Sequence, residues 1–570
     1  MEVKFVNINR WVSWLIQMKI AIMKRFVLAL ILIGSAAGAS AQFQGKLPEV
    51  KLPVFKKDTI NIAAKGAVPD GYTLNTVFIN GAIEELSKKG GGVVLVPSGL
   101  WLTGPVVLQD NINLHLAVGA TLLFTADKSQ YPLVEANWEG LPQMRNQSPI
   151  SATNVSNIAI TGKGIVDGNG DGWRQVKKDK LTETQWKKLV ASGGVLSDDK
   201  KSWFPSEQFK KAHLMPSNPG ALAPGRDKAY FESIKDFLRP NLVLITNCKQ
   251  ILLEGVTFQN SPAWCLHPLM SEHLTVRNIS VKNPWYAQNG DGIDVESCRN
   301  VLIEHSVFDV GDDALCMKSG RDEEGRKRGM PTENVIIRGC TVYASHGGFV
   351  VGSEMSGGAR NIWVSNCSFI GSDIGLRFKT TRGRGGVVEN IYIKDIYMKD
   401  IPGEAILFDM YYAAKDPIPL AGEERVLPKV EFKAVDETTP VFKNIHISNV
   451  YCNGAEKAIF VRGLPEMPVK DIVLENMVIQ SKKGLDIQEA NGIVFRNIQV
   501  ESKETQPVVD IIQSRNLVFE KIKYASGSAL LFRLSGERCD NINIGRTDST
   551  GCKEQIKYEL GATNKAIALQ

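Results

Sequence analysis

The fold is decided within residues 334–393, where an asparagine followed by alternating apolar residues occurs three times. The three stretches read Asn334-Val335-Ile336-Ile337, Asn361-Ile362-Trp363-Val364 and Asn390-Ile391-Tyr392-Ile393. Their spacings are 27 residues (334 to 361) and 29 residues (361 to 390), and a nearly constant period of this size is typical of solenoids. Period-two alternation predicts strands that bury one face.

The same unit continues on both sides of this stretch. It begins again at Asn157, Asn300, Asn444, Asp471, Gly492 and Asn516. Asparagine at a repeated position can stack, with its amide bonded from coil to coil, and Gly and Asn permit tight corners. A leucine-rich repeat would show regular leucines and helical halves, which are lacking here. The sequence therefore predicts an all-β chain folded as a parallel β-helix.

The segment before the repeats predicts a helical cap for the open end of the solenoid. Apolar residues recur at helical spacing after Asn75, and the glycines at 90–92 end the run. The residues at that spacing are Val77, Phe78, Ala82 and Leu86. A solenoid needs such a cap because its first coil would otherwise expose core residues.

Two long stretches interrupt the repeat, residues 173–238 and 413–441. The first holds Trp173, Trp186, Trp203 and many charged residues, and predicts a mostly helical or irregular excursion. Long insertions in solenoids often emerge on the binding face. We therefore expect both insertions to form walls of a cleft.

The N-terminus has the pattern of an export signal. A basic start at residues 23–25 precedes an apolar run, Phe26–Ile33, and a small-residue cleavage site that ends at Ala41. The run is too short to span a bilayer, which takes about 20 apolar residues. We expect residues 1–41 to be a leader and 42–570 to be one exported parallel β-helix domain, periplasmic or extracellular, with no membrane span.

Charge and cysteine content exclude several classes of function. The net charge of +6 on 570 residues is too small to indicate a nucleic-acid partner. The nine cysteines are odd in number and contain no C-x-x-C pair, so neither a disulfide framework nor a zinc site is indicated. We interpret Cys298, Cys316, Cys340 and Cys367, which lie in apolar runs, as core residues.

Four polar clusters lie between the predicted strands. They are Asn289-Gly290-Asp291-Gly292-Ile293-Asp294, Gly311-Asp312-Asp313, Ser345-His346-Gly347-Gly348 and Arg377-Phe378-Lys379. The intervals are 21 residues (291 to 312), 34 (312 to 346) and 31 (346 to 377), each close to one coil. Because adjacent strands lie about 4.8 Å apart, three carboxylates, an imidazole and two cations would share one patch.

This combination of carboxylates, imidazole and cations is typical of a glycosidase that acts on an acidic sugar. Glycoside hydrolysis requires a carboxylic acid to protonate the leaving oxygen and a carboxylate to activate water or attack the sugar. Crowding of like charges keeps one carboxyl of Asp291, Asp312 and Asp313 protonated. Arg377 and Lys379 share one strand face, with Phe378 pointing inward, and can bind a sugar carboxylate. Tyr411 or Tyr412 could stack on a sugar ring.

The ordered clusters resemble the polygalacturonase family, glycoside hydrolase family 28, whose pattern is N-T-D, G-D-D, G-H-G and R-I-K. The departures are Gly290 for Thr, Ser345 for the first Gly and Phe378 for Ile, and none removes a carboxylate, imidazole or cation. The resemblance extends from about residue 92 through the last repeats. The run from Ser345 to Glu354 resembles exo-acting bacterial members.

The resemblance implies a right-handed parallel β-helix and inverting hydrolysis of α-1,4-galacturonosyl linkages in pectin, without metal or cofactor. By position, Asp312 is similar to the general acid, and Asp291 and Asp313 are similar to the pair that activates water. His346 would support the protonation state of the acid. Substrate-binding positions are Arg377, Lys379 and Asn289. We expect a monomer whose partner is pectin or polygalacturonate, with exo action favoured.

Three alternatives stay open at this point. A rhamnogalacturonan or decorated-galacturonan hydrolase of the same family would use the same residues. A pectate lyase would need a calcium-binding acidic cluster and an arginine base. A non-catalytic β-solenoid glycan binder would show aromatic stripes along a groove instead of a carboxylate cluster.

Overall fold

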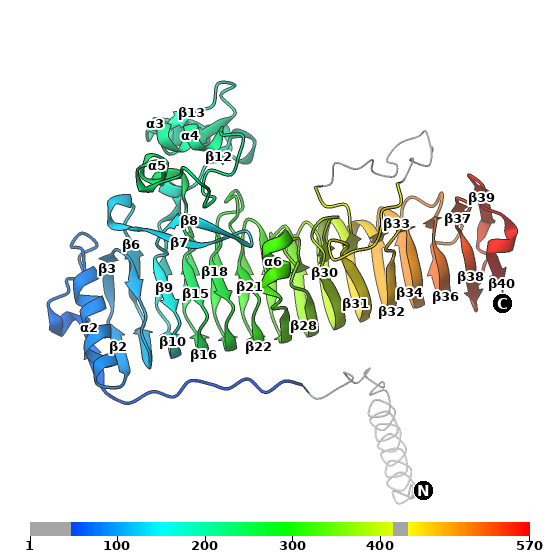
Figure 1. The fold of residues 1–570 in the computed structure, drawn as a ribbon. Coiled ribbons are helices and arrows are strands. Elements are labelled where there is room, and N and C mark those ends of the chain that lie inside the picture. Colours follow the sequence, from blue (N-terminus) through cyan, green and yellow to red (C-terminus); the bar gives the residue numbers. More distant parts are fainter. Residues whose placement is uncertain (1–46, 414–430, 570) are drawn as a thin grey trace, which may run out of the picture. The chain divides into compact units, whose positions relative to one another are not determined.

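The fold is described from a computed structural model, which covers residues 47–413 and 431–569. The predicted leader (1–41) and most of the predicted 413–441 excursion lie outside these residues. Within them, 35 strands form one continuous sheet whose named pairings are parallel. The chain winds as a coil, and each full turn contributes a strand to each of three faces (Figure 1). The predicted parallel β-helix is confirmed.

The first face carries the repeated asparagines. Its strands are β1 (Thr59–Asn61), β2 (Gly92–Val96), β5 (Ile112–Leu116), β10 (Ser156–Gly162), β16 (Lys249–Glu254), β19 (Glu272–Arg277), β22 (Arg299–Glu304), β25 (Thr332–Arg338), β28 (Ala359–Ile370), β30 (Val387–Asp409), β31 (Val441–Arg462), β32 (Val469–Ser481), β34 (Ala490–Ser502), β36 (Arg515–Tyr524), β38 (Asp540–Gly545) and β40 (Ile567–Leu569). From β28 onward several of these strands continue around a corner. β30 pairs along three separate stretches and so spans all three faces.

The second and third faces complete each coil. The second face comprises β3 (Gly99–Thr103), β6 (Ala120–Phe124), β11 (Ile165–Asp167), β17 (Thr257–Gln259), β20 (Ser280–Lys282), β23 (Val307–Asp309) and β26 (Thr341–Tyr343). The third face comprises β4 (Val106–Val107), β9 (Ile150–Thr153), β15 (Val243–Thr246), β18 (Leu266–Leu269), β21 (Ile293–Glu296), β24 (Asp313–Lys318), β27 (Gly347–Val351), β29 (Leu376–Lys379), β33 (Lys483–Gln488), β35 (Val509–Ile512), β37 (Ser528–Ser535) and β39 (Cys552–Glu559).

The repeated asparagines form the predicted ladder. At its centre the amide of Asn334 donates to Asn300 (3.2 Å), Asn361 donates to Asn334 (3.3 Å), and Asn390 donates to Asn361 (3.2 Å). These residues have left-handed backbone, with φ near +55°, a conformation in which asparagine is enriched. The ladder therefore pairs polar side chains at this corner of successive coils.

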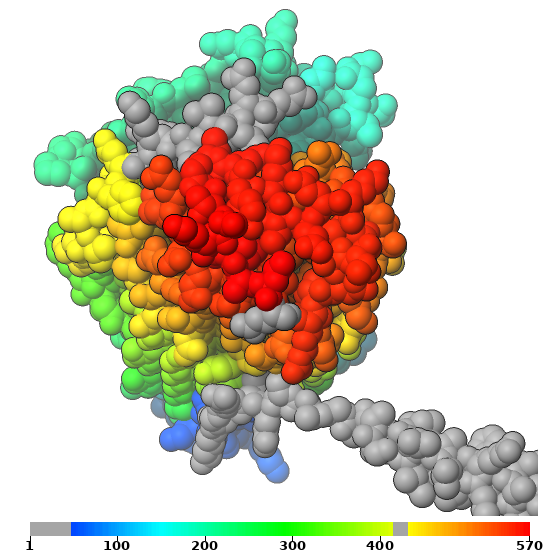
Figure 2. All heavy atoms as spheres, turned by 90° about the vertical axis from the view of Figure 1, so that its right-hand side faces the viewer, coloured from blue at the N-terminus to red at the C-terminus, as the bar shows by residue number. Residues whose placement is uncertain are grey.

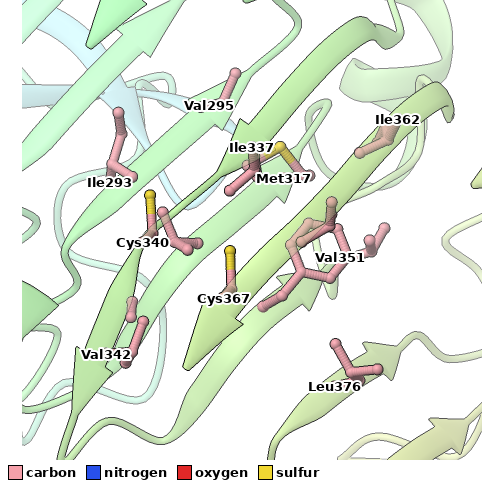
Figure 3. Close-up of a cluster of buried hydrophobic side chains, with 14 of the residues drawn as sticks. Ile293, Val295, Met317, Ile337, Cys340, Val342, Val351, Ile362, Cys367 and Leu376 are labelled. Atoms are coloured by element: carbon pink, nitrogen blue, oxygen red, sulfur yellow. The ribbon is translucent and has the colours of Figure 1, made fainter. Parts of the chain in front are cut away.

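One apolar core runs through the coils (Figure 3). Ile293, Val295 and Met317 from the third face meet Ile337 and Val342 in the interior. Further along, the ring of Phe378 stacks on Phe408 with centroids 4.5 Å apart, so coil-to-coil stacking extends to aromatic rings. The four cysteines predicted to be core are buried, and all nine, which lie in described parts of the chain, are free thiols.

The N-terminal end is capped by α2 (Thr76–Lys88), as predicted. Its buried side is formed by Ile79, Ala82, Ile83 and Leu86. The inclusion of Val77 in that face is wrong, because Val77 is 79% exposed; it lies in the first turn, ahead of the residues that reach the first coil. At the other end, the last coils cover the stack (Figure 2).

Two elements leave the coils near the third face. The β7–β8 hairpin (Leu133–Trp138, Leu141–Asn146) is antiparallel, and the sequence did not indicate it. Residues 173–238 form a small sheet of β12 (Val176–Lys177), β14 (Ser202–Phe204) and β13 (Val195–Leu196), with α3 (Glu183–Ala191), α4 (Glu207–His213) and α5 (Lys228–Ser233). Figure 1 shows this insertion on the side of the coils that carries the hairpin.

The remaining elements are short. They are the helix α6 (Asp322–Arg328) and the 3-10 turns η1 (Ile62–Lys65), η2 (Lys128–Gln130), η3 (Gly170–Trp173), η4 (Lys178–Lys180), η5 (Lys235–Phe237) and η6 (Asn564–Ala566). Across the described ranges, every helix falls short of the length and apolarity that a membrane-crossing helix requires.

Candidate active site

A pocket of about 350 Å³ opens beside the third face. Its lining comes from the insertion, from the loop before β21, and from the starts of the next third-face strands. The lining residues are Gln175, Lys177, Lys180, Trp285, Tyr286, Ala287, Gln288, Asn289, Gly311, Asp312, His346, Arg377, Lys379 and Tyr412. Five of the seven predicted site residues are among them.

The polar clusters fall on successive coils because β21, β24, β27 and β29 pair in that order. Asp291 lies just before β21, Asp312 and Asp313 at the start of β24, and His346 just before β27. One carboxylate oxygen from each of Asp291, Asp312 and Asp313 lies within 4.8 Å of the others. The predicted register thus brings the three carboxylates together on one flank.

Asp313 is held as a carboxylate by two cations. Lys379 Nζ lies 2.6 Å from its Oδ2, and Arg377 Nη1 lies 3.1 Å from its Oδ1. Burial would raise the pKa of Asp313, but the charges of Lys379, Arg377 and Lys318 outweigh burial and lower it. The two cations therefore favour the ionised form of Asp313.

Asp291 has the opposite environment. It is buried, and its Oδ1 has no hydrogen-bond partner in the described part of the chain. Burial raises the pKa of Asp291 well above its ordinary value, and the negative charges of Asp312 and Asp294 raise it further. Two neighbouring carboxyls thus differ sharply in proton affinity, an arrangement that separates acid and base roles in glycosidases.

Of these three aspartates, Asp312 alone lines the pocket, and 21% of its side chain is exposed. The Nδ1 atom of His346 lies 3.3 Å from Asp312 Oδ1, and its Nε2 lies 3.7 Å from Asp373 Oδ2. The hydrogen bond with Asp312 raises the pKa of His346, against the lowering effect of burial. The imidazole therefore tends to carry a proton beside the exposed carboxyl.

The Arg377-Phe378-Lys379 strand places its residues as alternation requires. Phe378 is fully buried in the core, whereas Arg377 and Lys379 line the pocket. Close packing depends on Gly347, because a Cβ there would lie 2.4 Å from Val350 and 3.2 Å from Asp313 Oδ1. Sequence reasoning assigned both cations to the substrate and did not foresee that both bind Asp313.

Asn289 and the two tyrosines are now placed. Asn289 lines the pocket, and its Oδ1 accepts a hydrogen bond from Arg239 Nη2 (2.8 Å). Tyr411 is buried in the core, whereas Tyr412 lines the pocket, with Lys379 Nζ 4.9 Å from its ring centroid. Tyr412 is therefore the tyrosine that a sugar in the pocket can reach.

A buried ionic group lies farther along the same third-face strands, and sequence reasoning did not assign it. Lys318 Nζ lies 2.9 Å from Glu354 Oε2 and 3.6 Å from Asp294 Oδ1. All three residues are buried. Asp294 belongs to the same sequence cluster as Asp291 (residues 289–294), and this proximity could have indicated it. Lys318 and Glu354 each follow a mostly apolar stretch of sequence, where a charged residue is unusual because burying a charge is costly unless it is paired.

Oxygens at the spacing of Asp291, Asp312 and Asp313 could approach a cation. Asp313, however, already has two cationic partners, and Asp291 favours its neutral form. The local charge is thus compensated by the protein itself. These residues fit proton transfer better than metal binding, because ligating carboxylates must be ionised.

Comparison with known proteins gives a consistent result. Residues 234–453 match glycosyl hydrolases family 28. An exo-poly-alpha-D-galacturonosidase of Dickeya chrysanthemi is 27% identical, over 77% of this chain and 70% of the relative. The crystal structure of a hyperthermoactive exopolygalacturonase from Thermotoga maritima is 32% identical, with a TM-score of 0.63, over 79% of this chain and 92% of that chain.

A second solved structure, the family 28 exopolygalacturonase of Yersinia enterocolitica, shares the fold. It is 22% identical with a TM-score of 0.61, over 78% of this chain and 75% of that chain. These neighbours are right-handed parallel β-helices, so the expected handedness of the coil is confirmed.

Proposed function

The chain belongs to glycosyl hydrolases family 28 and is a glycoside hydrolase, and from this premise we propose that it hydrolyses α-1,4-galacturonosyl bonds of pectin from a chain end. A hydrolase is thereby favoured over the alternatives of a pectate lyase and a non-catalytic β-solenoid glycan binder. The observation that carries the proposal is the partly exposed carboxyl of Asp312, set among Asp291, Asp313 and the imidazole of His346.

In the proposed mechanism each group has one task. Asp312, the carboxyl that a sugar can touch, protonates the glycosidic oxygen. As the glycosidic bond breaks, the attacking water bonds to the anomeric carbon and gives its proton to the carboxylate form of Asp291, whose raised pKa makes it the better proton acceptor. Asp313 stays ionised and polarises that water. His346, whose pKa is raised by Asp312, orients that acid. Arg377 and Lys379 present positive charge to the sugar carboxylate.

Inversion is part of the proposal and rests on family membership. In inverting glycosidases the acid and base carboxyls lie about 6.5–9.5 Å apart. Here the nearest oxygens of the three aspartates lie within 4.8 Å, closer than expected. The ion pairs of Asp313 nevertheless occupy both its oxygens, which disfavours it as a nucleophile and favours activation of water.

Exo action is supported by the insertion, which forms one wall of the pocket, and we assign the hairpin as a second barrier outside the pocket lining. The insertion contributes Gln175, Lys177 and Lys180 to the lining. The hairpin tip reaches the loop before α6, where Arg321 N–H donates to Gly140 O (3.3 Å) and Arg321 Nη1 lies 3.3 Å from Glu139 Oε2. Two relatives that carry exo activity in their names match most of the chain.

The leader pattern at residues 1–41 supports export to the periplasm or the exterior, where pectin fragments are met. The second candidate function is hydrolysis of rhamnogalacturonan, because one cationic pair alone does not require uronates at both sides of the bond. Product profiles on polygalacturonate and rhamnogalacturonan distinguish the two.

The direct test is Asp312→Asn, assayed on polygalacturonate by release of reducing ends. We expect kcat to fall by about 10³-fold or more, since the amide cannot donate the acid's proton. Asp309→Asn, three residues away on the exposed end of β23, is the matched control and should retain activity. Full turnover by the Asp312 variant would refute the assignment.

A further inference from the structure

The end of the pocket remote from Tyr412 has an unusual composition. Lys177 and Lys180 line it together with Trp285. Trp285 is 53% exposed, and Lys180 Nζ lies 5.3 Å from its ring centroid. A tryptophan this exposed beside a binding pocket offers a flat apolar surface on which a sugar ring can stack.

The two lysines differ from the cations at the other end. Among the described residues, neither Lys177 nor Lys180 forms an ion pair or a side-chain hydrogen bond, whereas Arg377 and Lys379 both bind Asp313. Lys178 lies between them in sequence. Its Nζ lies 3.5 Å from Glu183 Oε2, and the residue does not line the pocket. The uncompensated positive charge of the pocket is therefore at the insertion end.

The insertion holds these lysines in a fixed relation to the aspartates. Val176 packs with Trp186 and Trp203 in a small core that Tyr286 also contacts. The side-chain amide of Gln175 donates a hydrogen bond to the side-chain oxygen of Gln288, which directly precedes Asn289. The same loop carries Trp285 and leads directly into Asp291, so lysines, tryptophan and catalytic carboxylate form one connected unit.

The two charged ends flank Asp312. The loop of Trp285 precedes β21, Asp312 directly precedes β24, and Arg377 lies on β29. Three coil steps separate β21 from β29, which is about 14 Å along the stack. A carbohydrate that spans the pocket therefore meets a cationic group on each side of the acid.

We propose that Lys177, Lys180 and Trp285 form a second carboxylate-binding subsite, which takes the uronate on the opposite side of the cleaved bond from Arg377 and Lys379. This inference rests on the proposed galacturonan hydrolysis and narrows it. Uronates must stand on both sides of the bond, so unesterified homogalacturonan is the preferred backbone. A backbone that alternates uronate with a neutral sugar would leave one of the two cationic ends empty.

The test combines a protein change with a substrate change. Lys177→Met with Lys180→Met, and Lys178→Met as the matched control, are assayed on trigalacturonate and on its methyl ester. For the free acid we expect KM of the double variant to rise about tenfold with kcat nearly unchanged, because the carboxylate is bound equally in the ground and transition states. The KM of the double variant for the methyl ester should rise much less, because the ester has no carboxylate charge for the lysines to bind.

An equal loss on both substrates, or a fall in kcat at constant KM, would overturn the subsite. Trp285→Leu should raise KM for acid and ester alike, because stacking does not depend on the carboxylate. The control variant should behave as the unaltered enzyme; a matching KM rise in Lys178→Met would show that general surface charge, and not the subsite, attracts the substrate.

Binding measurements keep this inference separate from the proposed function. Calorimetric titration of trigalacturonate into Asp312→Asn, with and without the two lysine substitutions, measures the subsite without turnover. If the unaltered enzyme fails to hydrolyse polygalacturonate, the proposed function fails, and the titration still decides the subsite. Equal affinities in both backgrounds would refute the lysine pair even if hydrolysis is confirmed.

Discussion

Lys379 Nζ lies 2.6 Å from Asp313 Oδ2, and both side chains are buried at the base of the pocket. A single buried contact therefore favours the ionised form of one proposed catalytic carboxyl and immobilises one of the two predicted substrate-binding cations. The proposed catalytic and binding groups thus belong to one charge network.

Lys379→Met removes that contact. We expect kcat on polygalacturonate to fall on the order of 10²-fold or more, because a carboxyl whose pKa was held low will now protonate at higher pH. The acid limb of the pH–rate profile should move upward in pH. Lys457→Met is the control, since Lys457 pairs with Asp486 at 2.9 Å on the same face outside the pocket. An unmoved acid limb would contradict the role of Lys379.

His346→Gln tests the imidazole beside Asp312. Because the hydrogen bond with Asp312 raises the pKa of His346, the imidazolium is present below that pKa and is lost as pH rises through it. We expect the alkaline limb of the rate profile to flatten in the variant, with kcat lowered about 10- to 100-fold at the optimum. His305→Gln, an exposed histidine 3.9 Å from Glu304, should leave the profile unaltered.

Lys318→Met probes the buried ionic group farther along the third-face strands. Loss of the ammonium leaves buried Asp294 without its cation and buried Glu354 with only Arg384, whose Nη2 lies 3.9 Å from Glu354 Oε1. We therefore expect a destabilisation of roughly 3 kcal/mol, measured as a lower Tm. Lys88→Met removes an exposed pair with Glu84 on α2 and should change Tm little. A Tm equal to that of the control would refute the stabilising role of Lys318.

The same group predicts how stability depends on pH. Burial would raise the pKa of Glu354, but Lys318 outweighs it and lowers the pKa to about 2. A carboxyl with a depressed pKa contributes stability above its unfolded pKa, near about 4.3, and loses it as pH falls toward the folded value. The difference in Tm between Lys318→Met and the unaltered protein should therefore shrink between about pH 4 and pH 2.

Gly140→Val tests whether the hairpin tip closes the cleft. Gly140 has φ +77°, and a Cβ there would lie 2.6 Å from Arg321 N, so a larger residue must push the tip away from the loop before α6. We expect viscosity of polygalacturonate to fall faster per bond cleaved, as internal bonds become accessible. Gly527→Val is the control, because Gly527 has φ +82° but open space around its Cβ. A purely terminal product pattern in the Gly140 variant would exclude this role.

The product anomer tests inversion. Proton NMR during the first minutes of hydrolysis should show β-galacturonic acid released from the α-linked substrate before mutarotation. Initial release of the α anomer would mean retention, and would agree with the short distances between the carboxylates.

The sequence was most informative where the chain repeats. Asn334, Asn361 and Asn390 marked the corners, because a solenoid uses the same backbone conformation at each one. The period then determined which clusters share a flank, and so Asp291, Asp312 and His346 could be placed together. The segments between the repeated strands carry no period, and for this reason Trp285, Lys177 and the β7–β8 hairpin were not assigned.

The sequence also did not reveal which charged side chains pair with each other. Arg377 and Lys379 were correctly assigned to one strand face, and Phe378 to the interior. Their contact with Asp313 was not foreseen, because the conformation of a long side chain depends on packing against neighbouring coils. Val77 shows a similar limit: helical spacing defined an apolar stripe, but only contact with the first coil decides where the stripe begins.

The proposed catalytic groups come from successive turns of the coil, with Asp312 and Asp313 on the same turn, and this has a consequence for how such a protein can change. An extra complete turn inserted between β24 and β27 could preserve the stacking of core and asparagines. It would nevertheless move His346 and Arg377 away from Asp312 by one strand spacing, about 4.8 Å. Lengthening within the active region is therefore confined to the corners, where added residues reshape the rim and leave the reaction distances intact.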